Sequence, residues 1–511
     1  MSHANDATLQ EPVPTSASSS PPPQEAASAN PSASPSLRGG GGGGDSGDMP
    51  RLIQAGMGVR VSNVRLANAV ARLGAIGVVS SVGLRYLTVE EIRQGKQEII
   101  DVARAFPIPS YVDDLLAFAP GGPKNGAPNP MDNPNPAKSE LPKRLSVIAA
   151  FIEVTRAKQG HHGMIGINVM WKCALTALPS IYGAMLAGVD VLLCGAGVPM
   201  ELPDIVRRIQ AGQDLEYTPL HGTETNARLT IAPDNAAEFV NRFPTPKLIP
   251  ILSNYAFPKR IFDIWAREYG TRPDAFVLEN HPAGGHNAPP RNKVSFGEAD
   301  DVDSYFDKVR NLGVPVYVAG AGSSREDFQE WIGRGAYGMQ VGSRFALCAE
   351  SGMRDDLKRE IIGRNAAGEG EVLTSNRLSS TGYPFKYVPL PGTLSDEAVY
   401  ESRKRICNKG YLMHSHFTEG ADGETHETYV CPGMPESQYA KLGGAPEDTE
   451  GRMCLCNALL GTIGMADPGE PAIVTLGEDG VNVKQWHTAR DIVEDLLTPK
   501  YAADAESRLA A

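Results

Sequence analysis

One loop of the sequence combines a proton-transferring side chain with a backbone that leaves room for a ligand. It runs Glu-Asn-His-Pro-Ala-Gly-Gly-His-Asn from Glu279 to Asn287, directly after an apolar run that is typical of a buried strand. Gly284 and Gly285 let the backbone lie against a ligand, and the imidazole of His286 can take or give a proton near neutral pH. We therefore predict that His286 is catalytic. A loop histidine that only makes hydrogen bonds is the alternative, and His281 is a weaker candidate.

Two neighbouring glycine turns form a second candidate site. Gly320-Ala321-Gly322 ends the apolar run 316–319, and Gly342-Ser343-Arg344 ends the run 338–341. Glycine lets the chain turn sharply next to a ligand, and the free N–H groups at the start of a helix attract anions. Together the two turns predict a phosphate cradle. The alternative is that the glycines only make tight turns.

The elements that must hold these loops follow a repeating order. Eight short apolar runs, each typical of a strand buried on both faces, alternate mostly with stretches of helical periodicity. The first such helix begins near Val64, and Ser62 is predicted to cap it. This order over about 300 residues predicts an α/β fold of the (β/α)8 TIM barrel type, with a doubly wound open sheet as the alternative. The predicted strands are 51–58, 76–82, 164–169, 189–194, 247–252, 275–279, 316–319 and 338–341.

In such a barrel the working residues lie at the carboxyl ends of the strands. The predicted strand ends are rich in glycine, amide and hydroxyl groups and poor in carboxylates. This composition suits a large uncharged ring with a phosphate tail better than it suits metal-assisted hydrolysis. It predicts bound flavin mononucleotide (FMN) and no metal ion.

Four of the seven cysteines lie in the last third of the chain, close to three histidines. The sequence lacks the paired Cys-x-x-Cys spacing that marks many zinc and iron–sulfur sites. We therefore expect buried structural thiols, with a metal site as the alternative. The residues concerned are Cys407, Cys431, Cys454 and Cys456, with His414, His416 and His426.

Composition limits the classes of partner. The 511 residues carry 48 basic and 60 acidic side chains, a formal charge of −12, so a nucleic-acid partner is not expected. No apolar run is long enough to span a membrane, and no signal peptide is visible. The seven scattered cysteines indicate reduced thiols and predict a cytoplasmic protein.

The chain divides into three parts by composition. Residues 1–49 are rich in Ser, Pro, Ala and Gly and are predicted to form a disordered low-complexity tail. Residues 50–352 hold the predicted barrel. The alternation of strands and helices then stops, and residues 353–511 are predicted to be an extension packed on the barrel, without a second catalytic site. A homodimer is compatible with these features, which do not decide the oligomeric state.

The sequence contains five short glycine-rich or strand-end motifs, at residues 54–57, 166–169, 283–286, 319–322 and 338–345. They stand in the order in which they occur in nitronate monooxygenases, formerly called 2-nitropropane dioxygenases. Residues 50–352 therefore resemble this family, whose pattern also includes flavin-dependent enoyl-acyl carrier protein reductases and the trans-acting enoyl reductases of polyketide synthases. The resemblance implies a TIM barrel that binds FMN non-covalently. The motifs are Gln54-Ala55-Gly56-Met57, Gly166-Ile167-Asn168-Val169, Ala283-Gly284-Gly285-His286, Ala319-Gly320-Ala321-Gly322 and Gly338-Met339-Gln340-Val341-Gly342-Ser343-Arg344-Phe345.

The resemblance also implies roles for residues at matching positions. His286 would be the catalytic histidine. The flavin ring and ribityl chain would lie against one group of residues: Gln54, Ala55, Gly56, Met57, Asn168, Ala283, Gly284 and Gly285. The phosphate would lie against a second group: Gly320, Ala321, Gly322, Gly342 and Ser343, with Gln340 close by.

Three functions are compatible with these features, all with a small-molecule substrate or ligand. The preferred one is oxidation of a nitronate or similar carbanion by flavin and O2, with His286 as base. The second is an NAD(P)H-dependent reduction of an activated double bond, on an acyl or carrier-bound substrate, with His286 as proton donor. The third is a non-catalytic flavin-binding subunit or sensor.

Overall fold

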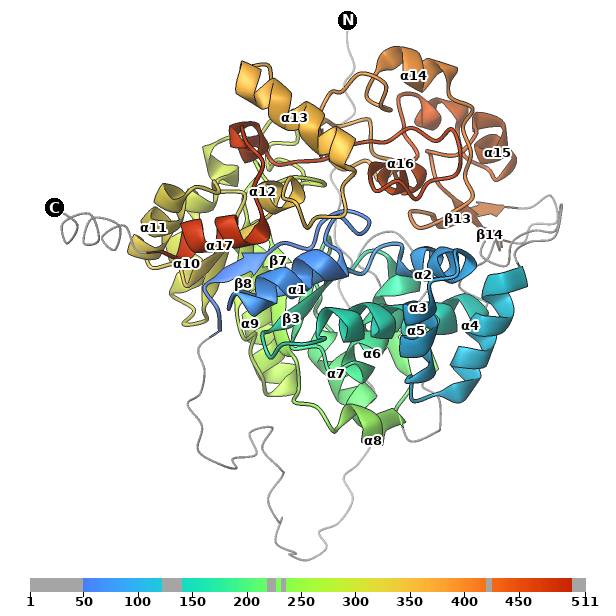
Figure 1. The fold of residues 1–511 in the computed structure, drawn as a ribbon, viewed down its shortest axis with the longest axis horizontal. Helices are drawn as coiled ribbons and strands as arrows, with labels where there is room; N and C mark the ends of the chain where they lie inside the picture. Colours follow the sequence, from blue (N-terminus) through green and yellow to red (C-terminus); the bar gives the residue numbers. More distant parts are fainter. Residues whose placement is uncertain (1–48, 122–139, 218–226, 231–235, 420–424, 499–511) are drawn as a thin grey trace, which may run out of the picture. The chain divides into compact units, whose positions relative to one another are not determined.

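The computed structural model describes residues 49–121, 140–217, 227–230, 236–419 and 425–498 (Figure 1). The tail predicted for residues 1–49 lies outside these ranges apart from Met49. From Pro50 onward the chain belongs to one unit, which contains both the predicted barrel and the predicted extension. No helix in the described ranges is long and apolar enough to cross a membrane.

Eight parallel strands form the closed barrel that the sequence predicts. They are β1 (Leu52–Gln54), β2 (Gly77–Ser80), β3 (Ile165–Met170), β4 (Val191–Gly195), β7 (Lys247–Leu252), β8 (Phe276–Glu279), β9 (Val316–Ala319) and β10 (Gly338–Val341). Their order is β1-β10-β9-β8-β7-β4-β3-β2. The last seam is closed where Gln54 N donates to Ile76 O at 3.0 Å and Ile76 N donates to Leu52 O at 2.9 Å. The alternative of an open doubly wound sheet is therefore wrong.

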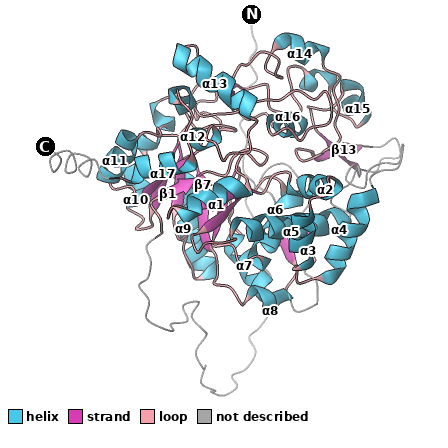
Figure 2. Ribbon diagram, in the orientation of Figure 1, coloured by secondary structure: helices cyan, strands magenta, loops and turns pink. Residues whose placement is uncertain are grey.

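Helices cover the outer face of the strands (Figure 2). Each strand packs against helices on its outer face and against the side chains of the barrel interior on its inner face. Every residue of β2, β4, β9 and β10 is therefore buried, as their apolar composition requires. A short antiparallel hairpin, β5 (Leu215–Tyr217) with β6 (Ala227–Leu229), follows the fourth strand. The helices up to β10 are α1 (Val64–Arg72), α2 (Leu84–Arg93), α3 (Gln97–Arg104), α4 (Pro109–Gly121), α5 (Glu140–Ala157), α6 (Ala174–Leu186), α7 (Leu202–Gln210), α8 (Ala236–Val240), α9 (Ala256–Tyr269), α10 (Phe306–Arg310) and α11 (Arg325–Gly333).

The turn after β1 differs from its predicted form. Asn63 caps α1, because its side chain accepts a first-turn N–H at 2.8 Å, so the prediction of Ser62 as the cap is wrong. The fully buried Ser62 hydroxyl instead donates to Ala55 O at 2.7 Å and accepts from Met57 N and Gln54 Nε2, both at 2.8 Å. These hydrogen bonds hold the turn after β1 in place and fix the backbone at the mouth of the barrel.

The segment after β10 includes residues 353–498 of the extension predicted for residues 353–511. It contains two antiparallel hairpins and several short helices, and Figure 1 shows most of these elements gathered together. They are α12 (Ser343–Ala346), α13 (Asp355–Ala367), β11 (Leu373–Ser375), β12 (Phe385–Tyr387), α14 (Glu397–Ser402), β13 (His414–Glu419), β14 (Thr425–Val430), α15 (Glu436–Lys441), α16 (Leu455–Thr462) and α17 (Ala489–Leu497).

The helix α17 belongs to the outer layer of the barrel. It contacts α1, α11 and α12, and it lies beside α11 and α12 in Figure 1. Its buried residues Ala489, Ile492, Val493 and Leu496 join the same hydrophobic core as α1. Residues 353–488 are thus inserted between the last strand and a helix that completes the ring.

A buried ion cluster fixes the loop between β1 and α1. Arg60 is only 8% exposed and has a φ of 52°, which is uncommon for a residue with a side chain. Its guanidinium lies 2.6 Å from the carboxylate of Glu153 in α5 and 2.8 Å from that of Glu91 in α2. Since Glu153 is fully buried, it depends on this arginine for compensation of its charge.

Removal of one carboxylate should therefore destabilise the fold. We expect Glu153→Ala to lower the free energy of unfolding by about 3 kcal/mol or more, because Arg60 is left as a buried charge with one partner fewer. Urea denaturation measures this change. Glu98→Ala is the matched control, since the Glu98 side chain is 59% exposed and 3.9 Å from Arg156, and it should change stability by less than about 0.5 kcal/mol. Equal effects of the two substitutions would contradict the role of the cluster.

Candidate active site

A cavity of about 570 Å³ opens at the carboxyl ends of the barrel strands. Residues at all eight strand ends line it, and the extension supplies the rest of its wall through residues such as Tyr383, Phe385 and Leu476. This volume is in the range of small-molecule sites. The position agrees with that of active sites in TIM barrels.

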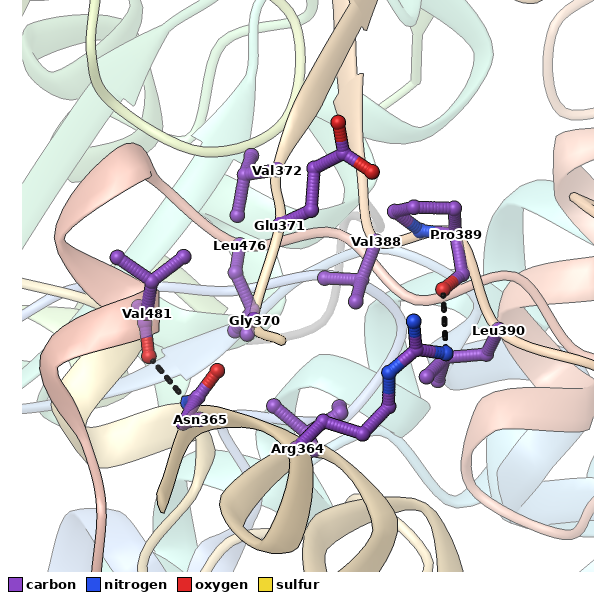
Figure 3. A pocket seen from close by; sticks show the side chains of 12 residues that line it. Arg364, Asn365, Gly370, Glu371, Val372, Val388, Pro389, Leu390, Leu476 and Val481 are labelled. Carbon is purple, nitrogen blue, oxygen red and sulfur yellow. Dashed lines mark hydrogen bonds between the residues drawn. The ribbon is translucent and has the colours of Figure 1, made fainter. Parts of the chain in front are cut away.

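A second hollow lies inside the extension, beside α13 (Figure 3). It holds only about 10 Å³, roughly the room for one water molecule, so it is a packing defect and not a ligand site. Beside it, the buried Asn365 amide donates to the carbonyls of Gly480 and Val483, both at 2.9 Å. These bonds anchor the segment 476–483, which reaches the large cavity.

The predicted site residues meet at the large cavity with two exceptions. Gln54 is fully buried behind the wall, where its Oε1 accepts from Val78 N at 3.0 Å and joins β1 to β2. Ala321 also does not line the cavity. The predicted residues that do line it are Ala55, Gly56, Met57, Asn168, Ala283, Gly284, Gly285, His286, Gly320, Gly322, Gln340, Gly342 and Ser343.

The loop that carries His286 pairs with the extension through its backbone. Asn287 N donates to Pro384 O, and Lys386 N donates to Gly285 O, each at 2.9 Å. An added Cβ on Gly284 would lie 2.7 Å from the backbone of the segment 476–477, so the loop and the extension are in close contact. The glycines that suggested contact with a cofactor therefore also serve the packing of the extension.

The ring of His286 is held by side chains of the extension. Phe385 packs against it edge to face, with ring centroids 4.9 Å apart. Nε2 lies 2.6 Å from Ser379 Oγ, which is in turn 2.8 Å from Thr381 Oγ1. When Ser379 donates to Thr381, it accepts the proton of Nε2, and Nδ1 is left as the basic nitrogen. Within the described residues Nδ1 of His286 has no hydrogen-bond partner.

Burial perturbs three titratable groups of this cavity. Burial, and then the nearby charge of Lys172, lowers the pKa of His286 to about 3, so this ring is neutral at physiological pH. Burial raises the pKa of Glu279, at the end of β8, to about 7. Burial also lowers the pKa of Lys172, whose Nζ lies 4.5 Å from the ring centroid of Tyr383. Such groups in one cavity are typical of active sites. Lys172 is not among the predicted site residues, because it lies beyond the predicted third strand, 164–169.

The extension also reaches the predicted phosphate cradle. Ser343 Oγ donates to Asp479 Oδ1 and accepts from Gly477 N, each at 2.8 Å. Asp479 itself lines the cavity. Local sequence patterns could not reveal this contact, because the two residues are 136 positions apart.

Polar groups without partners remain at the cavity. Gln340 is 5% exposed, and its Oε1 is buried with no hydrogen-bond partner in the described part of the chain. The N–H group of Gly322, which lines the cavity, likewise makes no hydrogen bond to a described residue. Because buried polar groups are nearly always paired, these atoms indicate a polar ligand.

Comparisons with known proteins agree with the resemblance seen in the sequence. Residues 248–376 match the family model described as nitronate monooxygenase. This segment is therefore similar to the nitronate monooxygenase family. This is a family of flavin-dependent oxidoreductases, so the predicted class of enzyme is confirmed.

A curated relative is the (3aS,4S,5R,7aS)-5-hydroxy-7a-methyl-1-oxo-octahydro-1H-indene-4-carboxyl-CoA dehydrogenase of Mycobacterium tuberculosis (strain ATCC 25618 / H37Rv). It is 28% identical over 102 residues, which cover 20% of this chain and 26% of that protein. The chain therefore matches only about a quarter of the length of this relative.

Two solved structures are similar over most of the chain. FabK from Thermotoga maritima aligns with a TM-score of 0.47 and 14% identity, over 90% of this chain and 96% of that one. A nitroalkane oxidase from Streptomyces ansochromogenes aligns with a TM-score of 0.46 and 14% identity, over 90% and 97%.

The seven cysteines are free thiols, and Cys456 lines the cavity. Its hydrogen bond with Cys454 lowers the pKa of Cys454 and raises that of Cys456. Cys431 and Cys454 are buried, as predicted for structural thiols, whereas Cys407 and Cys456 are partly exposed. In the described ranges, no three His, Cys, Asp or Glu side chains are placed to hold a metal ion.

The low pKa of His286 predicts a pH dependence of stability. The unfolded chain binds a proton at this histidine below its ordinary pKa of 6.5, whereas the folded chain binds it only near pH 3. Stability is therefore lost as the pH falls from 6.5 towards 3, by up to about 1.4 kcal/mol per pH unit. We expect His286→Asn to lack this contribution, so that urea denaturation of the two proteins gives stabilities that converge, or cross, as the pH falls from 7 to 4. A constant difference over this range would show that the folded protein protonates His286 normally.

Proposed function

We propose that the protein is an FMN-dependent oxidoreductase that oxidises a nitronate or a similar carbanion with O2, with His286 as base. The observation that carries this proposal is the neutral His286 in a glycine- and amide-lined cavity at the mouth of the barrel. The reduced state of its thiols suits a cytoplasmic protein, and O2 would be the co-substrate.

The described residues fit FMN. The cavity volume is sufficient, and Gln340 Oε1 and the N–H group of Gly322 lack partners that a flavin and its phosphate would supply. Gly56 has no room for a side chain, since an added Cβ would lie 2.1 Å from Cβ of Asn168. The ring would lie against residues 55–57, Asn168 and 283–285, and the phosphate against Gly320, Gly322, Gly342 and Ser343. Gln54 and Ala321 would support this site from behind the wall.

The bound flavin and the residues of the chain would have separate roles in the reaction. A bound flavin supplies the electron transfer between substrate and O2. His286 accepts the proton of an acidic C–H through the nitrogen that is not bonded to Ser379, and Ser379 with Thr381 selects the tautomer. Phe385, from the extension, packs against the imidazole and would hold the ring in its orientation.

Reduction of the flavin with two matched substrates tests the proposal. Under anaerobic conditions we expect ethylnitronate to bleach the visible flavin spectrum and NADPH to leave it oxidised. His286→Ala should retain flavin but react about 100-fold more slowly with nitroethane, which must lose a proton, and lose much less with preformed ethylnitronate. His281→Ala is the control, since His281 does not line the cavity and pairs with Asp301 at 3.0 Å.

Other outcomes would contradict the proposed reaction, the role of His286 or the proposed cofactor. Rapid bleaching by NADPH would identify the NAD(P)H-dependent enoyl reductase, which the family pattern also includes. Equal losses with nitroethane and ethylnitronate in His286→Ala would exclude the role of base. A protein that neither contains nor takes up flavin would overturn the assignment of FMN as the cofactor.

A further inference from the structure

Lys172 is a cation in the wall of the cavity without a carboxylate partner. It follows β3, where its N–H donates to Ala196 O at 3.1 Å, and its side chain lines the cavity. No carboxylate of the described residues lies within 4.0 Å of its Nζ. Burial lowers the pKa of Lys172, and the neighbouring Cys173 opposes this shift.

Other lysines buried in the same protein are paired. The side chain of Lys358 is fully buried and lies 2.9 Å from Asp355, and that of Lys386 is 2% exposed and lies 2.7 Å from Glu478. Removing an ammonium group from water is costly unless an anion compensates its charge. Lys172 is partly exposed in the cavity wall and, unlike these two lysines, has no carboxylate partner among the described residues.

The surroundings of Lys172 do not supply the missing negative charge. The aromatic face of Tyr383 provides a cation–π contact at 4.5 Å, and His286, on which the charge of Lys172 acts, is neutral. Of the two carboxyl groups that line the cavity, Asp479 is bonded to Ser343, and Glu279 is not paired with this lysine. The counter-charge must come from a ligand or from solvent.

We infer that Lys172 binds the anionic end of the substrate, a planar oxyanion such as a nitronate, next to His286. The inference rests on the proposed function and names the residue that would recognise its substrate. When His286 accepts the proton of a neutral carbon acid, the electron pair of the C–H bond moves onto the oxygens, and Lys172 would hold the new negative charge. An ammonium group with three rotatable donors suits an anion whose orientation is fixed by other contacts.

Calorimetric titration with a matched pair of probes tests this inference without turnover. Propionate has the planar two-oxygen anion of ethylnitronate, and propionamide has the same shape without the charge. We expect the full-length protein to bind propionate at least about ten-fold more tightly than propionamide, as for one hydrogen bond to a charged group. Lys172→Met should abolish this preference, and Lys172→Arg should retain part of it.

The control is Lys308→Met, which removes an exposed lysine of α10 far from the cavity lining and should keep the full preference. Thermal unfolding of each variant checks that the fold is retained, and Lys172→Arg reports on charge if Lys172→Met does not fold. Equal binding of both probes by the unmodified protein, no binding of propionate, or an undiminished preference in Lys172→Met would overturn the inference. A Lys172-dependent preference in a protein that nitronates do not reduce would refute the proposed function and leave the anion site intact.

Discussion

The site depends on the backbone pairing between the His286 loop and the extension. Two hydrogen bonds of 2.9 Å join residues 285–287 to residues 384–386 and hold the extension over the mouth of the barrel. Burial is the main cause of the low pKa of His286, the raised pKa of Glu279 and the lowered pKa of Lys172, and the extension supplies part of the wall around these groups. Without the extension, the cavity would lose the part of its wall that contacts His286.

The insertion is fixed at both ends to the barrel. It leaves after β10 and returns through α17, which packs between the barrel helices. Between these ends, Asn365 of α13 anchors the segment that brings Asp479 to Ser343. A carboxylate at the predicted phosphate cradle opposes a phosphate of the same charge, so a bound phosphate would depend on the backbone N–H groups of the glycine turns for its attraction.

The barrel could be predicted from the sequence because each strand can be recognised from its own residues. Runs such as Val316–Ala319 are apolar on both faces, and the glycines that follow them mark the strand ends where the cavity lies. Contacts between distant segments carry no such local signal. Ser62 has the composition of a helix cap, yet the neighbouring Asn63 takes that role and Ser62 organises the turn after β1. In the same way, Gln54 belongs to a motif of the family but points behind the wall, and the contact between Ser343 and Asp479 follows only from the folded chain.

Hydrogen–deuterium exchange with and without FMN tests most directly whether the barrel and the extension form one cofactor site. We expect FMN to slow amide exchange in the barrel turns 320–323 and 342–345, and also in the segment 475–480 of the extension. Residues 256–269, which form α9 and hold no predicted phosphate contact, should be unaffected. Protection confined to the barrel turns, with unchanged exchange at 475–480, would contradict the claim that the extension completes the site.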